Sequence, residues 1–167
     1  MSHGEIDPAQ FRHVLARYAT GVVVVSTCVD GVDHAMTANS FTSVSLEPAL
    51  VLVCVDRGSR FHEAVTATTR WAVSILSAES EPQAAWFAQR GRPLAGQFAG
   101  VASMRGPISG ALLVSGALAH LECRTHASFP GGDHDILVGR VESLSPADDR
   151  EPLLYYRHHF RRLGAGQ

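Results

Sequence analysis

A hydroxyl-rich stretch between two apolar runs carries the densest group of hydrogen-bonding side chains in the sequence. Residues 34–45 read His-Ala-Met-Thr-Ala-Asn-Ser-Phe-Thr-Ser-Val-Ser. If this chain is extended, its polar side chains fall on both faces: Thr37, Asn39 and Ser43 on one, Ser40 and Thr42 on the other. A purely structural strand normally keeps one face apolar, although an edge strand with a serine-rich turn is the simpler alternative. We favour a ligand site here, because so many donors can meet one flat or phosphorylated ligand.

A second polar cluster, Arg57-Gly58-Ser59-Arg60, follows soon after this stretch. Ser59 is a good N-cap for a short helix reaching about residue 68, and two guanidinium groups at a helix N-terminus form a phosphate site. The alternative is an exposed loop, for whichever arginine points outward. All fourteen basic residues are arginines. The missing lysine excludes a Walker A loop and a Schiff base to pyridoxal phosphate.

Histidines beside carboxylates form the third group of candidates. Asp133-His134-Asp135 follows a double-glycine turn and could ligate a metal or contact a substrate, although a solvated turn explains the same composition somewhat better. His120-Leu121-Glu122 resembles half of a zinc deaminase motif, but the Pro-Cys-x-x-Cys that must accompany it is missing, so we interpret it as structural. His158-His159 is expected to face solvent.

Several other functional classes lack their motifs. The sequence has no Gly-x-Gly-x-x-Gly between a strand and a helix, which excludes a Rossmann site but not another way of binding nicotinamide. It also has no Gly-x-Ser-x-Gly nucleophile elbow. The cysteines are odd in number, far apart and set in apolar runs, so we expect buried free thiols at Cys28, Cys54 and Cys123. No metal site is expected.

Composition describes an ordinary globular protein. The 167 residues are 46% apolar and 18% charged, which predicts one domain spanning residues 1–167. A net charge of -2 gives no reason to expect binding to nucleic acid or to an anionic membrane. No apolar run approaches the roughly 20 residues of a membrane span, and the first residues lack the features of a signal peptide. A cytoplasmic location is the expectation.

The elements that must position these residues are mostly short strands. Asp7-Pro8 and the spacing of Phe11, Val14, Leu15 and Tyr18 predict a helix over about 8–18. A β-hairpin is predicted over 21–45 around Asp30-Gly31, followed by a strand over 50–55 that is buried on both faces. The capping box Ser80-Glu81-Pro82-Gln83 predicts a helix ending near 91.

The second half continues the pattern of neighbouring strands. Further strands are predicted over 71–76, 136–144 and 153–156, a long loop over 91–111, and one long or kinked strand over 112–129. Residues 130–133 form the turn of a hairpin. The tally favours a mainly β fold, an antiparallel barrel with two or three short helices.

Six segments in this order resemble the flavin reductase domain family, the small reductase components of two-component flavin monooxygenases. They are Ala-Thr-Gly-Val-Val-Val-Val (19–25), Met-Thr-Ala-Asn-Ser-Phe-Thr-Ser-Val-Ser-Leu-Glu-Pro (36–48), Leu-Val-Leu-Val-Cys-Val (50–55), Gly-Ala-Leu-Ala-His-Leu-Glu-Cys (116–123), Gly-Gly-Asp-His (131–134) and Pro-Leu-Leu-Tyr-Tyr (152–156). The resemblance covers about residues 10–162. Relatives often have Tyr-Arg-Gly-x-Tyr near the end, where this chain has Tyr156-Arg157-His158-His159-Phe160.

The resemblance implies an FMN-binding split β-barrel of Greek-key type and a homodimer. It implies an NAD(P)H:flavin oxidoreductase that passes a hydride from NADH or NADPH to FMN or FAD. The reduced flavin would supply a partner monooxygenase. A flavin- or haem-binding protein of similar shape without turnover is the alternative.

The resemblance also implies site residues. The isoalloxazine and ribityl chain would be lined by Met36, Thr37, Ala38, Asn39, Ser40, Ser43 and Val44. The ribityl and phosphate end would be held by Cys54, Val55, Ser59 and Arg60, and Phe87 and Phe98 match positions near the flavin. The catalytic position falls to His134, which would contact the nicotinamide cofactor.

Overall fold

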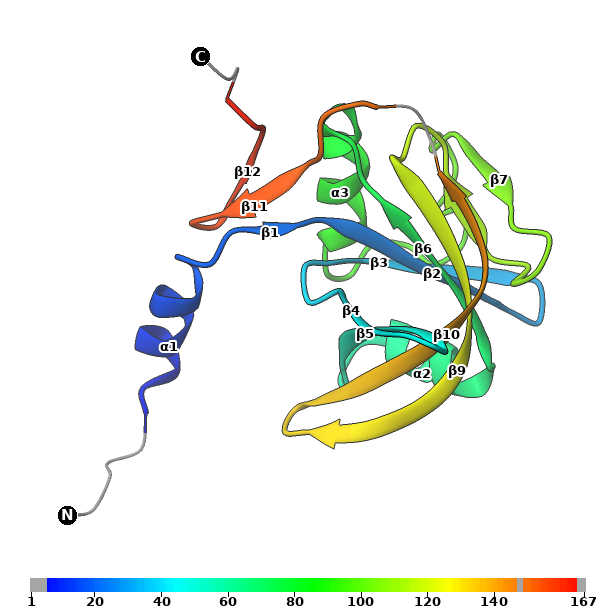
Figure 1. The fold of residues 1–167 in the computed structure, drawn as a ribbon, viewed down its shortest axis with the longest axis horizontal. Coiled ribbons are helices and arrows are strands. Elements are labelled where there is room, and N and C mark those ends of the chain that lie inside the picture. Colours follow the sequence, from blue (N-terminus) through cyan, green and yellow to red (C-terminus); the bar gives the residue numbers. More distant parts are fainter. Residues whose placement is uncertain (1–5, 147–148, 165–167) are drawn as a thin grey trace.

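A curled antiparallel sheet of seven strands forms the body of the protein in the computed structural model, which describes residues 6–146 and 149–164 (Figure 1). The sheet order is β3-β2-β6-β9-β10-β5-β4. The strands are β2 (Val23–Val29), β3 (Val32–Ala38), β4 (Thr42–Leu46), β5 (Ala49–Asp56), β6 (Arg70–Ile75), β9 (Ala119–Gly131) and β10 (His134–Pro146).

Two small sheets and three short helices complete the described fold. One sheet pairs β1 (Thr20–Gly21), β11 (Leu154–Tyr156) and β12 (His159–Arg161), and the other pairs β7 (Ser103–Arg105) with β8 (Leu112–Val114). The helices are α1 (Pro8–Leu15), α2 (Arg60–Ala67) and α3 (Glu81–Ala88), with a 3-10 turn at Ala78–Ser80. The predicted mainly β antiparallel fold with two or three short helices is therefore confirmed.

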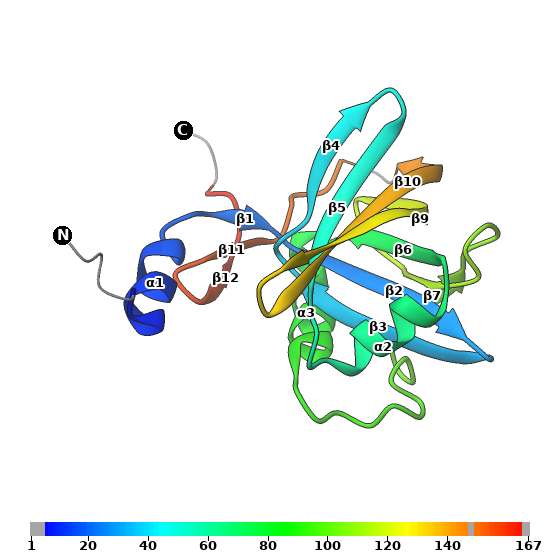
Figure 2. The same cartoon turned by 90° about the horizontal axis from the view of Figure 1, so that it is seen from below.

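A serine hydroxyl links the two ends of the large sheet. Ser40 lies in the turn that leads from β3 to β4, the two outermost strands of the sheet. Its Oγ accepts a hydrogen bond from the Cys54 amide at 3.1 Å and donates one to the Cys54 carbonyl at 3.2 Å. The turn after β3 is thereby fixed to β5, so that the hydroxyl-rich stretch wraps around one side of the barrel (Figure 2).

Two apolar clusters hold the elements together. Trp71, Val53, Val73 and neighbouring residues fill the barrel interior, and a second cluster packs α3 against the sheet through Phe87, Leu76 and Leu153. Gly139 sits at a register shift between β10 and β9, where an added Cβ would lie 2.3 Å from Cζ2 of Trp71. Only glycine allows β10 to pass this close to the buried indole.

An arm made of α1, β1, β11 and β12 extends from the barrel (Figure 1). The helix has the predicted start, because Oδ1 of Asp7 accepts a hydrogen bond from the Ala9 amide at 3.0 Å, but it ends at Leu15, before the predicted residue 18. The predicted apolar stripe is exposed to solvent, and α1 has no buried residue. In the β11–β12 turn, Arg157 and His158 take φ values of 51° and 64°, a left-handed pair without the glycine that relatives often have.

Three local predictions differ from the structure. The apolar run 112–129 is divided into β8 and β9 by a turn in which Gly116 takes a φ of 80°, so it is not one strand. Strand β5 is buried on one face only; Leu50, Leu52 and Cys54 are half-buried. Helix α3 begins at Glu81, but the Ser80 side chain does not cap it and contacts Ser77 instead. None of the described helices is long and apolar enough to cross a membrane.

Candidate functional site

A pocket of about 330 Å³ opens between β3, the start of α2 and the segment after α3. Its size is in the usual range for small-molecule sites. Strand β3 contributes residues 34–37, the end of β5 contributes Asp56, the β5–α2 loop contributes Gly58 and Ser59, and α2 contributes its first residues. The segment 87–92 and Gln97 close the other side. The pocket brings five predicted residues together: Met36, Thr37, Ser59, Arg60 and Phe87.

The N-terminus of α2 forms one end of this pocket. Ser59 caps the helix as predicted: its Oγ accepts a hydrogen bond from the His62 amide at 3.1 Å and donates one to the Asp56 carbonyl at 2.7 Å. Arg60 follows as the first helical residue, and its Nη2 donates to the carbonyl oxygen of Arg92. A helix N-terminus with an arginine beside it favours an anionic group.

The two arginines of the predicted phosphate cluster have different environments. Arg60 lines the pocket, whereas the guanidinium of Arg57 donates to Asp135 Oδ1 from Nε at 2.8 Å and from Nη2 at 2.6 Å. Arg57 is therefore paired within the protein, and it lies in an exposed turn, as the alternative interpretation described.

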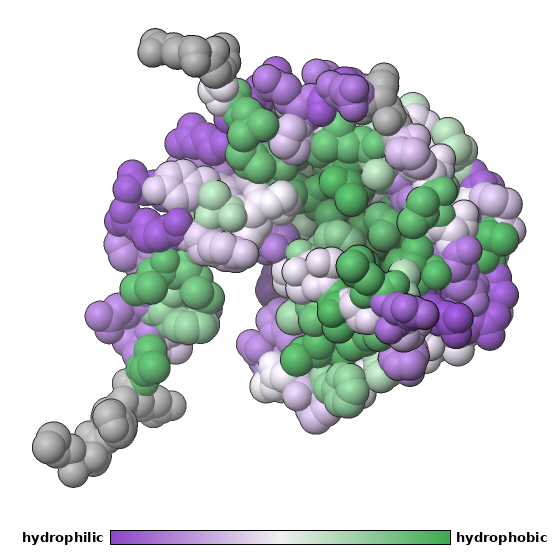
Figure 3. Space-filling view, viewed as in Figure 1, coloured by the Kyte–Doolittle hydropathy of each residue, from purple (hydrophilic) through white to green (hydrophobic). Residues whose placement is uncertain are grey.

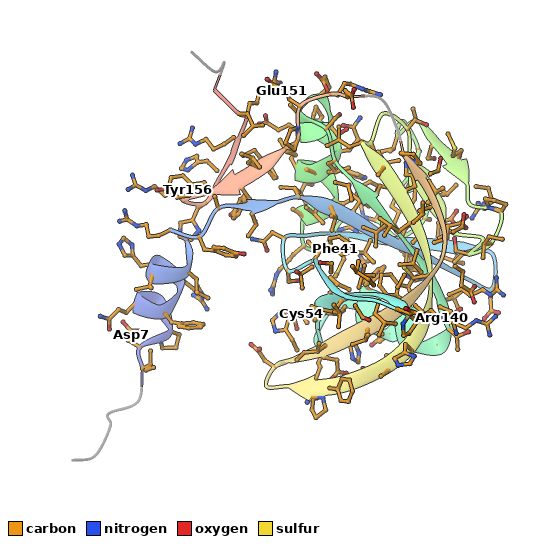
Figure 4. All side chains as sticks on the ribbon, viewed as in Figure 1. Asp7, Phe41, Cys54, Arg140, Glu151 and Tyr156 are labelled. Atoms are coloured by element: carbon orange, nitrogen blue, oxygen red, sulfur yellow. The ribbon has the colours of Figure 1, made fainter. Side chains whose placement is uncertain are left out.

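The hydroxyl-rich stretch divides into structural and free side chains. Thr37 Oγ1 donates to the Ala84 carbonyl of α3 at 2.6 Å, and Ser40 is occupied by Cys54, as described above. Ala38 and Val55 point into the core, so only their backbone atoms could meet a ligand. Asn39, Ser43 and Val44 are exposed and do not line the pocket. Figure 4 shows Phe41, which follows Ser40 in the chain, on the same side of the barrel as Cys54.

Arg92 adds a second cation to the lining of the pocket. Arg92 donates from Nη1 to the Phe87 and Gln89 carbonyls at 2.9 and 3.0 Å, and from Nη2 to the carbonyl of Ala35. Burial, and then the charge of Arg60, lower the pKa of the Arg92 guanidinium from its ordinary value, which is too high for this to discharge it at neutral pH. The same two causes, burial first, lower the pKa of His34. A lowered pKa favours the neutral form of the His34 imidazole.

An aromatic pair, Phe87 and Phe98, packs against the Arg92 guanidinium through Phe87. The ring centroids of Phe87 and Phe98 lie 4.8 Å apart, and the guanidinium carbon of Arg92 lies 5.4 Å from the Phe87 centroid. Gln97, next to Phe98, donates from Nε2 to the Asp33 carbonyl. The segment 89–98 is thus tied to β3, and Phe98 contacts the pocket through Phe87 rather than lining it.

His134 lies at the start of β10, next to the pocket's rim. It pairs in register with Asp56 of β5, and Asp56 lines the pocket. The His134 ring is partly exposed, with Nδ1 at 2.7 Å from Oδ1 of Asp133. That hydrogen bond is the main cause that lowers the pKa of the Asp133 carboxyl. The carboxylate orients the imidazole, and Nε2 has no hydrogen-bond partner among the described residues.

Several pocket residues are absent from the sequence-based set, among them His34, Arg92 and Gln97. His34 was the first residue of the stretch singled out, but its neighbours carried the family pattern. Arg92 and Gln97 lie in the predicted loop 91–111, where sequence alone gives no sign that the loop folds back onto β3.

The remaining titratable candidates have structural roles. Glu122 is buried and its Oε2 accepts from the Ile108 and Ser109 amides and the Ser109 hydroxyl at 2.6–3.0 Å, and His120 Nε2 contacts the Val114 carbonyl. Burial raises the pKa of the Cys123 thiol to about 12, so this free cysteine is no nucleophile. Of the three thiols, only Cys123 is fully buried. Within residues 6–146 and 149–164, no group of three His, Cys, Asp or Glu side chains could hold a metal ion.

Comparison with known proteins adds independent findings. The profile of the flavin reductase like domain matches residues 15–164. An NADH-dependent FAD reductase of Streptomyces globisporus is 45% identical over 159 residues, which cover 94% of this chain and 86% of that protein. The reductase subunit of a flavin-dependent monooxygenase from Rhodococcus jostii is 37% identical over 155 residues, covering 93% and 77%.

A solved structure is also similar over nearly the whole chain. The Streptomyces globisporus C-1027 NADH:FAD oxidoreductase, in complex with NAD and FAD fragments, superposes with a TM-score of 0.90 at 42% identity and with 96% of each chain covered. This similarity confirms the predicted split-barrel fold class.

Proposed function

The chain belongs to the flavin reductase like domain family, and from that premise we propose that it transfers a hydride from NADH to FAD. The reduced flavin would then pass to a separate oxygenase, as the similarity to a monooxygenase reductase subunit supports. One observation carries the proposal: the capped N-terminus of α2 and Arg60 open onto a pocket whose rim reaches the Asp56–His134 pair. The family match over 15–164 also supports one flavin reductase domain.

The side chains of this protein are asked to bind and orient rather than to react. A bound flavin would supply the redox chemistry as the hydride acceptor. The protein must hold the two reacting rings at a near-attack distance of about 3–3.5 Å. It must also offer donors where negative charge develops. Asn39 and Ser43 have exposed polar side chains that suit that task.

A phosphate group fits the α2 end of the pocket on the chemistry of its donors. Arg60 supplies a guanidinium, and the first turn of α2 supplies amide groups. Nε of Arg92 is a buried donor without a partner among the described residues, and it belongs to a residue that lines the same pocket. These donors favour an anionic ligand portion at this end.

We propose FAD as the preferred flavin, because the pocket continues past the α2 N-terminus to Arg92, Phe87 and Gln97. A second cation beyond the first phosphate position suits the second phosphate of FAD. FMN would leave this part of the pocket unfilled.

We also propose a homodimer, because the arm exposes apolar side chains that a single chain leaves uncovered. Tyr18 is 75% exposed, and Phe11, Val14 and Leu15 share its apolar stripe. Figure 3 shows hydrophobic surface on the arm and in the hollow between the arm and the barrel. The barrel adds Leu46, which is 94% exposed at the β4–β5 turn. An eight-residue helix is not stable by itself. We therefore propose that a second copy of this chain packs on the arm and buries its apolar side chains.

We infer a cytoplasmic location from the thiols. The structure contains three free cysteines, which suits a reducing compartment.

Steady-state oxidation of NADH tests the proposed activity. The purified protein should oxidise NADH only when FAD or FMN is added, with a lower KM for FAD. A protein that binds flavin without flavin-dependent oxidation of NADH or NADPH would instead be a carrier or sensor.

A further inference from the structure

Next to His134, the side chains of Arg57 and His62 meet at the carboxylate of Asp135. Oδ1 of Asp135 accepts both bonds from Arg57, and Oδ2 lies 2.7 Å from Nε2 of His62. Asp135 comes from β10, Arg57 from the β5–α2 loop and His62 from the first turn of α2. The Asp135 side chain is only 20% exposed. A carboxylate held by two partners at these distances has a fixed orientation.

The group Arg57–Asp135–His62, called the clasp below, fixes the end of β10 that carries His134. His134 and Asp135 are neighbours in a strand, so their side chains leave opposite faces of the sheet. The Arg57 amide also donates to the Asp133 carbonyl at 3.1 Å. Residues on both sides of His134 are therefore bonded to Arg57, one through its backbone and one through its guanidinium.

The same clasp reaches the phosphate end of the pocket. His62 is bonded through its amide to Ser59, the residue that caps α2, and through its ring to Asp135. Arg57 lies two residues before Ser59 in the chain. One carboxylate thus connects the His134 hairpin to the helix start that lines the proposed flavin site.

We propose that Asp135 is a positioning residue for nicotinamide binding, which fixes His134 relative to α2 through Arg57 and His62. The proposal rests on the proposed function, in which His134 contacts the nicotinamide cofactor. Without the clasp, the hairpin tip loses its bonds to α2 and His134 samples orientations that bind NADH poorly. Flavin affinity changes little, since Ser59 and Arg60 keep their own contacts.

Asp135→Asn tests the positioning role, because it keeps the side-chain shape and removes the charge. We expect the KM for NADH to rise about tenfold, within the range of coupling between contacting groups, with kcat and the Kd of FAD nearly unchanged. Arg57→Gln, which strips both guanidinium bonds from the carboxylate, should raise the KM in the same direction. Circular dichroism melting of each variant shows whether it is folded.

Glu142→Gln is the matched control. Glu142 lies on the same strand, and its carboxylate also faces two arginines, with Arg124 Nε at 2.9 Å and Arg70 Nη1 at 4.0 Å. Its loss should leave the KM for NADH unchanged. An equal rise in both variants would overturn the proposal, because it would reflect a general loss of charge on β10.

A double variant separates positioning from simple destabilisation. If Asp135 acts through His134, then His134→Ala/Asp135→Asn should have the KM of His134→Ala alone. Multiplying effects, an unchanged KM in Asp135→Asn, or an unchanged KM in His134→Ala would each overturn the proposal. Failure of the proposed function appears separately, as wild-type protein that oxidises no NADH with any flavin, and that result would contradict both.

Discussion

Arg60 and Arg92 both line the pocket and are joined by a hydrogen bond from the Arg60 guanidinium to the Arg92 carbonyl. Each cation is placed for a different reason: Arg60 begins α2, whereas Arg92 ties the segment after α3 to β3. The charge of Arg60 contributes to the lowered pKa of Arg92. Two neighbouring cations repel one another, and a bound anion would relieve that repulsion.

The Arg60 side chain should bind the flavin phosphate. Arg60→Gln is expected to weaken FAD and FMN binding about tenfold to a hundredfold, the usual effect of losing a charged hydrogen bond. Riboflavin, which has no phosphate, should bind wild type and variant equally. Fluorescence titration with the three flavins measures both effects. Arg124→Gln, on the far ion pair with Glu142, is the control; equal losses for riboflavin and FAD would contradict the phosphate assignment.

Asn39 and Ser43 should act on flavin affinity before they act on hydride transfer. Their side chains are exposed and make no hydrogen bond in the described structure. Asn39→Ala and Ser43→Ala are each expected to raise the Kd of FAD about twofold to tenfold, with the hydride transfer rate of the saturated enzyme nearly unchanged. Thr42→Ala is the neighbouring control. A slower transfer rate at unchanged affinity would show that these groups act in the reaction instead.

His134 should serve nicotinamide binding. His134→Ala removes the imidazole that Asp133 orients, and the KM for NADH should rise about tenfold, more than the Kd of FAD. Steady-state kinetics at saturating flavin, with a separate flavin titration, give both values. An unchanged KM for NADH would remove His134 from the site.

The arm should hold two copies of the chain together. Val14→Asp places an unpaired charge in the apolar stripe of α1 and should weaken dimerisation by about 2 kcal/mol or more, roughly thirtyfold. Light scattering after size-exclusion chromatography should find a wild-type dimer and a concentration-dependent monomer in the variant. Met104→Asp, an equally exposed apolar residue on β7, should remain dimeric. A monomeric wild type would contradict the proposed assembly.

Local patterns in the sequence predicted much of the fold. The Ser59 cap, the Asp30-Gly31 hairpin and the Asp7-Pro8 helix start are decided by neighbouring residues, and all three are found. The prediction of one strand over 112–129 was wrong, because apolar residues continue across the turn. Only Gly116 marks where β8 ends and β9 begins. The burial of β5 was overestimated. Its apolar sequence is typical of a strand buried on both faces, but in the structure one face is only half-buried.

The site was less predictable, since its contacts join distant residues. Arg57 finds Asp135 across 78 positions, so the sequence could not tell which arginine of its cluster would face a ligand. Arg92 and Gln97 reach β3 only after a long loop folds back. The sequence predicted the apolar stripe of α1 correctly, but no described residue of the same chain covers this stripe.

Anaerobic mixing in a stopped-flow instrument tests the central claim most directly. Protein with bound FAD is mixed with NADH, and the absorbance of oxidised flavin is followed over a single turnover. We predict complete bleaching with one NADH consumed per flavin, a rate that saturates with NADH, and a slower rate when the transferred hydrogen is deuterium. Oxidised flavin that persists with NADH and NADPH alike would contradict hydride transfer at this site.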